Sequence, residues 1–300
     1  MADIVLMDGG MGQELIRRAP GPTDRGWGAR VMFDHPEMVV DLHKAFIEAG
    51  ATMIIVNAYA ATRCRLADIG REELFEPLQT MACDLAKRAR DETGVDVALA
   101  GSISPIQFSY RPDVVRPADE IAERCAEIAE LQAPHVDVMI CETMSMAAEA
   151  AASADGATSA GCPVWVGVTV DDGDGSKGRG GEPLSDFVAA TDKVDAWFAN
   201  CSKPEAVATA MTALSDLDVA FGGYANGFET LPPPSGVEAT ADRLIARKDL
   251  TPSDYAGHAM TWVDAGAGVV GGCCDVGPGH IAALKDALQA AGHNIVKPAL

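Results

Sequence analysis

Three of the eight cysteines stand where short apolar segments give way to polar loops. Cys201 follows the apolar segment 196–198, and the adjacent pair Cys273 and Cys274 follows the segment 269–270. Three thiolates could fill three corners of a tetrahedral Zn²⁺ site, and an open fourth corner is typical of a catalytic zinc. Adjacent cysteines often bind nothing, and the C-x-x-C spacing of a structural zinc site is absent, so spacing alone leaves metal binding open.

Two carboxylates, Asp8 and Glu142, hold corresponding positions after other apolar segments. Opposite a thiophilic metal, such a pair could bind an ammonium group through charge-assisted hydrogen bonds, while the Gly9 and Gly10 amides donate to a carboxylate. An amino acid with a thiol would satisfy all these groups. A helix N-cap or a loop salt bridge is the alternative explanation for either acid alone. Further polar residues at segment ends are Asn57, Tyr59, Ser102, Asp171, Asn200, Tyr224 and Asn226.

Eight apolar segments, each followed by a helical pattern, must position these residues. Apolar strands alternating with helices favour a parallel sheet, and eight repeats favour an α/β fold closed into a single (β/α)8 TIM-type barrel over residues 1–300. No G-x-G-x-x-G follows the first segment, which argues against a dinucleotide-binding fold. A barrel would bring all the segment ends to one face. The segments are Ile4 to Met7, Met53 to Val56, Val97 to Ala100, Val136 to Ile140, Val164 to Val168, Ala196 to Phe198, Val219 to Phe221 and Val269 to Val270.

The intervening segments carry helix signals. In 36–49 the residues Val39, Leu42 and Phe46 share one face, Pro36 stands at the first turn and Gly50 at the stop. The same spacing predicts helices over 118–133 and after residue 278. Three long connections that follow strands could close over the site as lids, or be plain surface insertions; they span residues 16–34, 171–181 and 228–236.

Charge and composition exclude several classes of protein. The chain has 23 Lys and Arg against 44 Asp and Glu, a formal charge of −21, so it lacks the basic surface that nucleic acids or anionic membranes require. No apolar run is long enough to span a bilayer. The first residues show no basic region of a secretory signal, so we expect a cytoplasmic protein with reduced thiols.

The chain resembles the homocysteine S-methyltransferases from Asp8 to about Ala291. The strongest matches are the opening Asp8-Gly9-Gly10-Met11-Gly12-Gln13-Glu14-Leu15, the pair Asn200-Cys201, and Gly271-Gly272-Cys273-Cys274. Supporting matches are His35-Pro36-Glu37, Gly101-Ser102, Cys141-Glu142-Thr143 and Gly181-Glu182-Pro183-Leu184. The resemblance implies a (β/α)8 barrel with zinc at the ends of strands 6 and 8, and a zinc-bound homocysteine thiolate as the nucleophile that becomes methionine.

The resemblance also implies roles for individual residues. Cys201, Cys273 and Cys274 would ligate Zn²⁺, and Asn226 would lie near the metal when substrate is absent. The other substrate-binding residues would be Asp8 and Glu142 on the amino group, Gly9 and Gly10 on the carboxylate, and Asn57 and Ser102 beside them. Coordination to Zn²⁺ deprotonates a thiol, and a methyl group on a positive sulfur or nitrogen then leaves a neutral product without a general acid.

The methyl donor is the open question. A cationic donor is held by aromatic faces, and Trp27 and Tyr59 are the candidates because relatives that use betaine or S-methylmethionine carry aromatics there. Betaine-type members add an aromatic after the amino-binding Glu and a long C-terminal arm, whereas this chain has Thr143 and stops after the last helix. We therefore favour S-methylmethionine, then S-adenosylmethionine. Betaine, dimethylsulfoniopropionate or a methylcorrinoid on a partner protein are the alternatives.

Two other classes of protein compete with a methyltransferase. A zinc-storing or thiol redox protein could use the adjacent cysteines as a switch, but it would have no use for Asp8, Glu142 and the Gly9-Gly10 pair. A zinc hydrolase should show His or carboxylate ligands, because three thiolates reduce the Lewis acidity needed to activate water, and no such set is evident.

Overall fold

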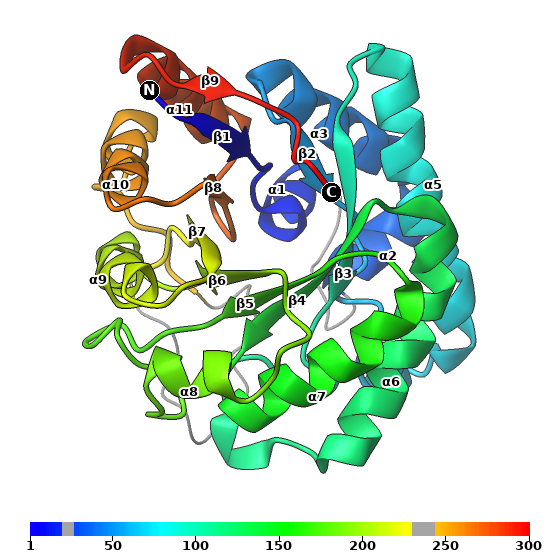
Figure 1. Ribbon diagram of the computed structural model, residues 1–300. Helices are drawn as coiled ribbons and strands as arrows, with labels where there is room; N and C mark the ends of the chain where they lie inside the picture. Colours follow the sequence, from blue (N-terminus) through cyan, green and yellow to red (C-terminus); the bar gives the residue numbers. More distant parts are fainter. Residues whose placement is uncertain (20–26, 230–243) are drawn as a thin grey trace.

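The structure is a computed structural model that describes residues 1–19, 27–229 and 244–300, apart from the Trp27 side chain (Figure 1). The strands are β1 (Asp3–Leu6), β2 (Met53–Ile55), β3 (Ala98–Ile103), β4 (Val138–Met144), β5 (Val164–Val168), β6 (Ala196–Asn200), β7 (Ala220–Ala225), β8 (Val269–Gly272) and β9 (Asn294–Ile295). The helices are α1 (Met11–Arg18), α2 (Trp27–Asp34), α3 (Pro36–Ala49), α4 (Arg63–Asp68), α5 (Phe75–Thr93), α6 (Ala118–Gln132), α7 (Ala147–Ala157), α8 (Leu184–Ala189), α9 (Pro204–Ser215), α10 (Pro252–Asp264) and α11 (Pro278–Ala290).

The strands form one curled parallel sheet in the order β2-β3-β4-β5-β6-β7-β8-β1-β9. Figure 1 shows the strands inside and the helices around them, an α/β architecture close to a TIM-type barrel. The prediction of a closed, eight-stranded barrel is confirmed only in part, because the sheet order is open, with β2 at one edge, and the described residues contain a ninth strand at the other edge, β9. With only two residues, this strand is too short to give a recognisable apolar segment.

One edge of β1 is shared between two partners. An isolated parallel bridge joins Met7, just after β1, to Met53, the first residue of β2, whereas the start of β1 pairs with β9. Strand β9 therefore fills the part of the seam between β1 and β2 that β2 does not reach. The bonds along this edge run from the N–H groups of Asn294, Val296 and Thr52 to the carbonyls of Ala2, Ile4 and Leu6, at 3.0, 3.0 and 2.7 Å.

Two apolar layers follow from the alternation of side chains along each strand. The larger layer packs between the sheet and the surrounding helices. The smaller one lies inside the curled sheet, where the rings of Trp165 and Phe198 stand 5.2 Å apart, centroid to centroid. In β3, β4 and β6 every second side chain points into the sheet interior, and the last of these on each strand is polar. Ser102, Glu142 and Asn200 therefore lie at the carboxyl end of the sheet interior.

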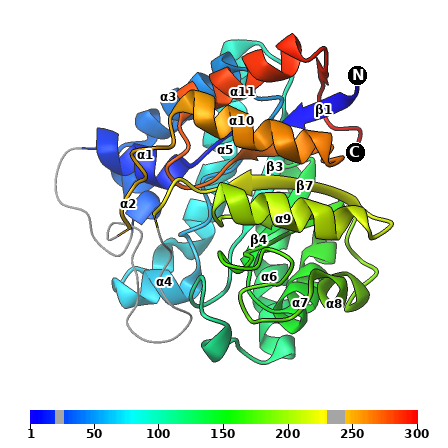
Figure 2. The ribbon, with the colours of Figure 1, turned by 90° about the vertical axis from the view of Figure 1, so that its left-hand side faces the viewer.

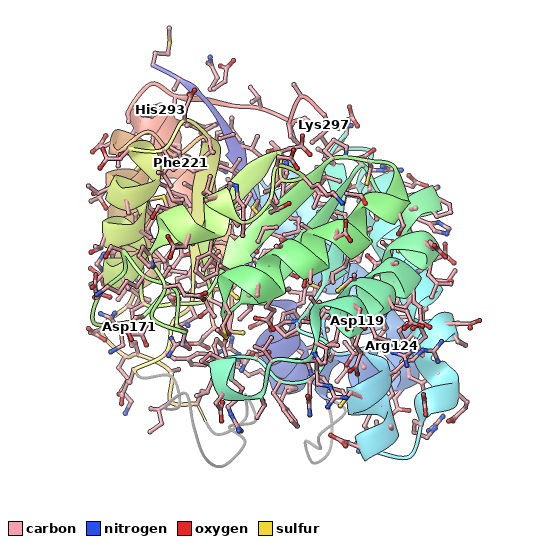
Figure 3. The ribbon with its side chains drawn as sticks, turned by 60° about the horizontal axis from the view of Figure 1, so that its bottom comes forward. Asp119, Arg124, Asp171, Phe221, His293 and Lys297 are labelled. Carbon is pink, nitrogen blue, oxygen red and sulfur yellow. The ribbon has the colours of Figure 1, made fainter. Side chains whose placement is uncertain are left out.

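The two ends of the sheet differ in what they carry. Figure 2 shows both chain termini at one end, and α1, α2 and α4 at the other. Figure 3 places Asp171, in the connection after β5, at the opposite end from His293 and Lys297. The described connections that follow strands therefore gather on one face, as the sequence predicted.

The helix predictions are confirmed for α3, α6 and α11. Gly50 ends α3 with φ of +112°, a left-handed conformation that glycine adopts without steric cost.

The predicted connection over 16–34 differs, because 27–34 forms α2 with Ala29, Val31 and Met32 buried. Residues 20–26 and 230–236 of the predicted lids lie outside the described residues. Within the described residues, we find no helix whose length and apolar character would suit a membrane crossing.

Candidate metal and substrate site

The three predicted cysteine ligands come together at the carboxyl end of the sheet. Cys201 follows β6, and Cys273 and Cys274 follow β8. The Cys201 sulfur lies 2.7 Å from that of Cys273 and 3.8 Å from that of Cys274, and all three fall within 4.8 Å of one another. Cys273 and Cys274 lie 72 and 73 positions after Cys201 in the sequence, and the prediction that the three would converge is confirmed. Three sulfurs at these distances could hold one metal ion.

A left-handed turn aims Cys201 at its partners. Its φ is +46°, which is unfavourable for a residue with a side chain, and Thr143 across the sheet has a φ of +66°. The Asn200 carboxamide joins the two turns, because its Oδ1 accepts from the Thr143 N–H at 3.1 Å and its Nδ2 donates to the Thr143 hydroxyl at 3.0 Å. These buried bonds stabilise the strained conformation beside the sulfur cluster.

The glycine pairs in the first and last loops are required by close packing. A Cβ on Gly10 would lie 2.5 Å from the Cys273 carbonyl oxygen, and a Cβ on Gly9 would lie 2.1 Å from the Val276 carbonyl oxygen. On the other side, a Cβ on Gly271 would lie 2.5 Å from the Cβ of Met7. Only backbone without side chains lets the loop after β1 approach the cysteine loop this closely.

Protonation within the sulfur cluster is uneven. Burial opposes ionisation of Cys201, but hydrogen bonds from Cys273, Cys274 and Tyr110 outweigh it and hold the pKa of Cys201 well below its usual range. The pKa values of Cys273 and Cys274 are raised, first by their hydrogen bonds to Cys201. Cys201 is therefore the cysteine of the cluster that ionises most readily, and the thiolate is the form of cysteine that binds metals.

The two predicted carboxylates are both buried in this end of the sheet. Asp8 Oδ2 accepts from the Ile55 N–H at 3.0 Å, and Glu142 Oε1 accepts from the Ser102 hydroxyl at 2.6 Å. Burial raises the pKa of Asp8 well above its usual range, with the charge of Glu142 adding to it. Burial raises the pKa of Glu142 to about 7, against the Ser102 hydrogen bond and with a contribution from the charge of Cys201.

Buried polar atoms at this end without a hydrogen-bond partner among the described residues include Oδ1 of Asp8 and Nδ2 of Asn226, besides the Tyr224 hydroxyl. The Asn226 side chain is otherwise fixed, because its Oδ1 accepts from the Phe228 N–H at 3.1 Å. Buried polar atoms are normally satisfied, so this pair points to a ligand that supplies a donor to Asp8 and an acceptor to Asn226.

Several predicted binding residues already have partners within the protein. The Gly10 N–H donates to the Val276 carbonyl at 2.9 Å, so in this structure it is not available to the carboxylate assigned to it, and Gly9 is left for that role. Asn57 Nδ2 donates weakly to the Gly28 carbonyl at 3.4 Å. Its predicted contact with substrate stays a prediction, as does that of Ser102.

The two predicted donor-binding aromatics are placed to different extents. The Tyr59 hydroxyl lies 2.6 Å from the Ser109 hydroxyl, and the Arg65 guanidinium lies 5.1 Å from the centroid of its ring. A cation of the protein thus covers one ring face, which leaves at most one face of Tyr59 for a donor. Trp27 is the first residue of α2, and its side chain lies outside the described part of the structure.

Sequence reasoning missed Tyr110, in the loop after β3. Its hydroxyl lies 3.0 Å from the Cys201 sulfur, and the Arg179 guanidinium lies 5.4 Å from its ring centroid. Arg179 is itself nearly buried and pairs with Asp172 at 3.5 Å. No local pattern marks Tyr110, because it stands several residues beyond its strand and reaches the cluster only through a left-handed turn with φ of +63°.

Comparison with known proteins agrees with this geometry. A family model described as homocysteine S-methyltransferase matches residues 5–288. The homocysteine S-methyltransferase of Escherichia coli (strain K12) is 28% identical over 307 residues, covering 94% of each chain. Crystal structures of the Escherichia coli homocysteine methyltransferase MmuM cover 95% of this chain and 96% of theirs, with a TM-score of 0.80 and 27% identity for the oxidized form and 0.77 and 26% for the metallated form. The chain belongs to the homocysteine S-methyltransferase family.

Proposed function

We propose that this protein transfers a methyl group from an onium donor to the thiolate of homocysteine, giving methionine, and that it needs Zn²⁺ to do so. One observation carries the proposal. The sulfur cluster and the buried carboxylates share one end of the sheet, and the charge of Glu142 adds to the raised pKa that burial gives Asp8 and that the hydrogen bond with Cys201 gives Cys274. A thiol and an ammonium group on one small molecule would match these two sets of groups.

The residues present fit a zinc ion. Cys201, Cys273 and Cys274 would hold it, and their soft sulfur donors suit Zn²⁺. When bound, the metal would supply a coordination position in which the substrate thiol ionises at neutral pH. The unpartnered Nδ2 of Asn226 lies among buried groups at the same end and supports its predicted place near the metal.

The chain itself would orient the amino acid. Asp8 and Glu142 would accept hydrogen bonds from the ammonium group, and Asp8 Oδ1 is a buried acceptor without a partner in the described residues. The amide of Gly9 would donate to the substrate carboxylate. Burial of both carboxylates excludes water, which strengthens their attraction to the ammonium group.

The transfer needs no proton from the protein. The thiolate sulfur forms a bond to the methyl carbon while the bond from that carbon to the positive sulfur or nitrogen breaks, and its electron pair stays on the leaving atom. The leaving group departs neutral, so no general acid is required. This agrees with a site whose carboxylates are buried and committed to binding.

We favour S-methylmethionine as the donor, then S-adenosylmethionine, with betaine, dimethylsulfoniopropionate or a methylcorrinoid partner as alternatives. Tyr59 and Trp27 are the aromatics proposed to hold the positive group. Burial raises the pKa of Tyr59 and the charge of Cys201 adds to this rise, which supports a position of that ring beside the cluster. We further propose that residues 1–300 act as a single domain in the cytoplasm.

The test is methionine formation from L-homocysteine by reduced, zinc-loaded protein in parallel reactions with each of the four small onium donors. A reductant is required because the sulfurs of Cys201 and Cys273 lie close enough to react. Turnover with one donor would establish the reaction and its donor together. Absence of methionine with all four, in protein that holds zinc and binds homocysteine, would reject the onium donors and leave the methylcorrinoid route.

A further inference from the structure

Ser102 of β3 stands where a neighbouring strand has ended. Ala98 and Ala100, four and two residues earlier in β3, turn their backbone groups toward β2 as Ser102 does. The Ala98 N–H donates to the Thr52 carbonyl at 3.0 Å, and the Ala100 carbonyl accepts from the Val56 N–H at 2.9 Å. Strand β2 ends before it reaches the level of Ser102. The N–H and C=O of Ser102 are buried there and need partners from elsewhere.

A glutamine side chain takes the place of the missing strand. Gln132, the last residue of α6, accepts from the Ser102 N–H at 2.8 Å through Oε1 and donates to the Ser102 carbonyl at 3.1 Å through Nε2. The same Nε2 donates to Oε1 of Gln79 at 2.6 Å, and Gln79 donates to the Ala61 carbonyl at 2.8 Å. Both glutamines are fully buried, and a Cβ on Gly101 would lie only 2.6 Å from Gln132 Oε1.

The two hydrogen bonds from Gln132 to the Ser102 backbone act on the end of the sheet where the substrate is proposed to bind. Holding the Ser102 backbone as a strand directs its hydroxyl inward, where it donates to Glu142 Oε1 at 2.6 Å. That bond fixes one carboxylate oxygen of Glu142. Without Gln132, two buried backbone groups of Ser102 would lose their partners and the strand end would relax.

We propose that Gln132, supported by Gln79, is a positioning residue for the ammonium group of the amino-acid substrate. It acts through the Ser102 backbone and hydroxyl on the Glu142 carboxylate. The inference rests on the proposed function, in which Glu142 binds that ammonium group. It predicts that loss of a carboxamide on the helix layer, outside the sheet, weakens recognition of one substituent of the substrate and spares the thiol.

The experiment compares two ligands by calorimetry on zinc-loaded, reduced protein without any methyl donor. L-homocysteine carries the ammonium group, and 4-mercaptobutanoate is the same thiol acid without it. In Gln132→Leu we expect the Kd for L-homocysteine to rise by about fivefold or more, and the Kd for 4-mercaptobutanoate to stay within about twofold. Because turnover is not measured, the result does not depend on the donor.

A double-mutant cycle tests the route through Ser102. Ser102→Ala removes the hydroxyl alone and should weaken L-homocysteine binding in the same selective way. Adding Gln132→Leu to Ser102→Ala should then cause little further loss, because both changes break one chain of contacts. Fully additive losses would show that Gln132 does not act through the Ser102 hydroxyl and would overturn the proposal.

A core variant on the same helix provides the control for stability. Ile128→Ala opens a cavity in α6 one turn from Gln132, where Ile128 is buried, and should leave the preference for L-homocysteine unchanged.

Should Gln132→Leu fold poorly, Gln79→Met removes only the outer support and should shift L-homocysteine binding selectively by a smaller factor. Equal weakening of both ligands, or the same effect from Ile128→Ala, would overturn the positioning role. Wild-type protein that does not prefer L-homocysteine would instead reject the ammonium site of the proposed function.

Discussion

The hydroxyl of Tyr110 lies 3.0 Å from the sulfur of Cys201, across 91 residues of sequence. Burial and the charge of Cys201 raise the pKa of Tyr110, so the phenol keeps its proton and donates to the sulfur. The Arg179 guanidinium over the ring and the left-handed backbone of Tyr110 fix the direction of this bond. A hydrogen bond to a thiolate withdraws electron density from it, so Tyr110 should tune Cys201, the proposed metal ligand that ionises most readily.

Replacing Tyr110 with Phe should raise the pKa of Cys201 in the metal-free protein by about one unit, because a hydrogen bond to a charged group contributes about 1.5–3 kcal/mol and part of it is regained from water. The pH dependence of iodoacetamide alkylation at Cys201, followed by mass spectrometry, measures this shift. Tyr255→Phe is the matched control, since its buried hydroxyl bonds to the Gly271 carbonyl at 2.6 Å. An unchanged alkylation profile in Tyr110→Phe would mean that the contact does not act on the thiolate.

Replacing Cys273 with Ala should remove most of the bound zinc and all methyl transfer. Two sulfurs would remain, and two thiolates alone make a weak tetrahedral site. Zinc content after dialysis, measured by atomic emission, checks the prediction. Cys162→Ala, which changes a half-buried cysteine outside the cluster, should keep both zinc and activity. Full zinc retention by Cys273→Ala would rule out the assigned ligand set.

Homocysteine binding should strengthen as pH rises through about 7, because the Glu142 carboxyl has a pKa of about 7 and must ionise to accept from an ammonium group. The raised pKa means that Glu142 is neutral below this pH, where the affinity should fall by up to about tenfold per unit. Calorimetric titrations between pH 5.5 and 8.5 would follow the change, a range of about 1.5 units on each side of the pKa.

The Glu142→Gln variant separates this titration from that of the substrate thiol. The thiol ionises in both proteins, so the ratio of the wild-type to the variant affinity reports the carboxyl alone. That ratio should grow with pH up to about 7 and level off above it. A ratio that is constant with pH would show that ionisation of Glu142 is not needed for binding.

Replacing Tyr59 with Leu should raise the KM of the donor by about threefold or more and leave that of homocysteine unchanged, because one cation-π contact contributes about 0.5–2 kcal/mol. Tyr59→Phe keeps the ring and removes the hydroxyl that contacts Ser109, so it should bind the donor nearly as the wild type does. Initial-rate kinetics with each substrate varied in turn distinguish the two effects. If both KM values rose together in Tyr59→Leu, the ring would be packing the site rather than binding the donor.

Local patterns in the sequence were enough to predict where the strands and the main helices lie. The two-residue period along β3 and β4 leads from apolar positions to Ser102 and Glu142, which is why strand ends could be read as one site. The same logic found Cys201 and Cys273 at the ends of β6 and β8. Strand β9 escaped it, because a two-residue strand has no period to detect.

The sequence by itself determined which residues could meet, since parallel strands deliver their ends to one face whatever the details of the loops. Only the tertiary structure decided which further contacts hold these residues in place. Tyr110 reaches Cys201 through a positive-φ turn, and the Gln132 side chain bonds to Ser102 where β2 has ended. The Val276 carbonyl accepts the hydrogen bond of the Gly10 N–H. These contacts join segments far apart in the chain, and they depend on loop conformation and on the space between layers, which no local periodicity records.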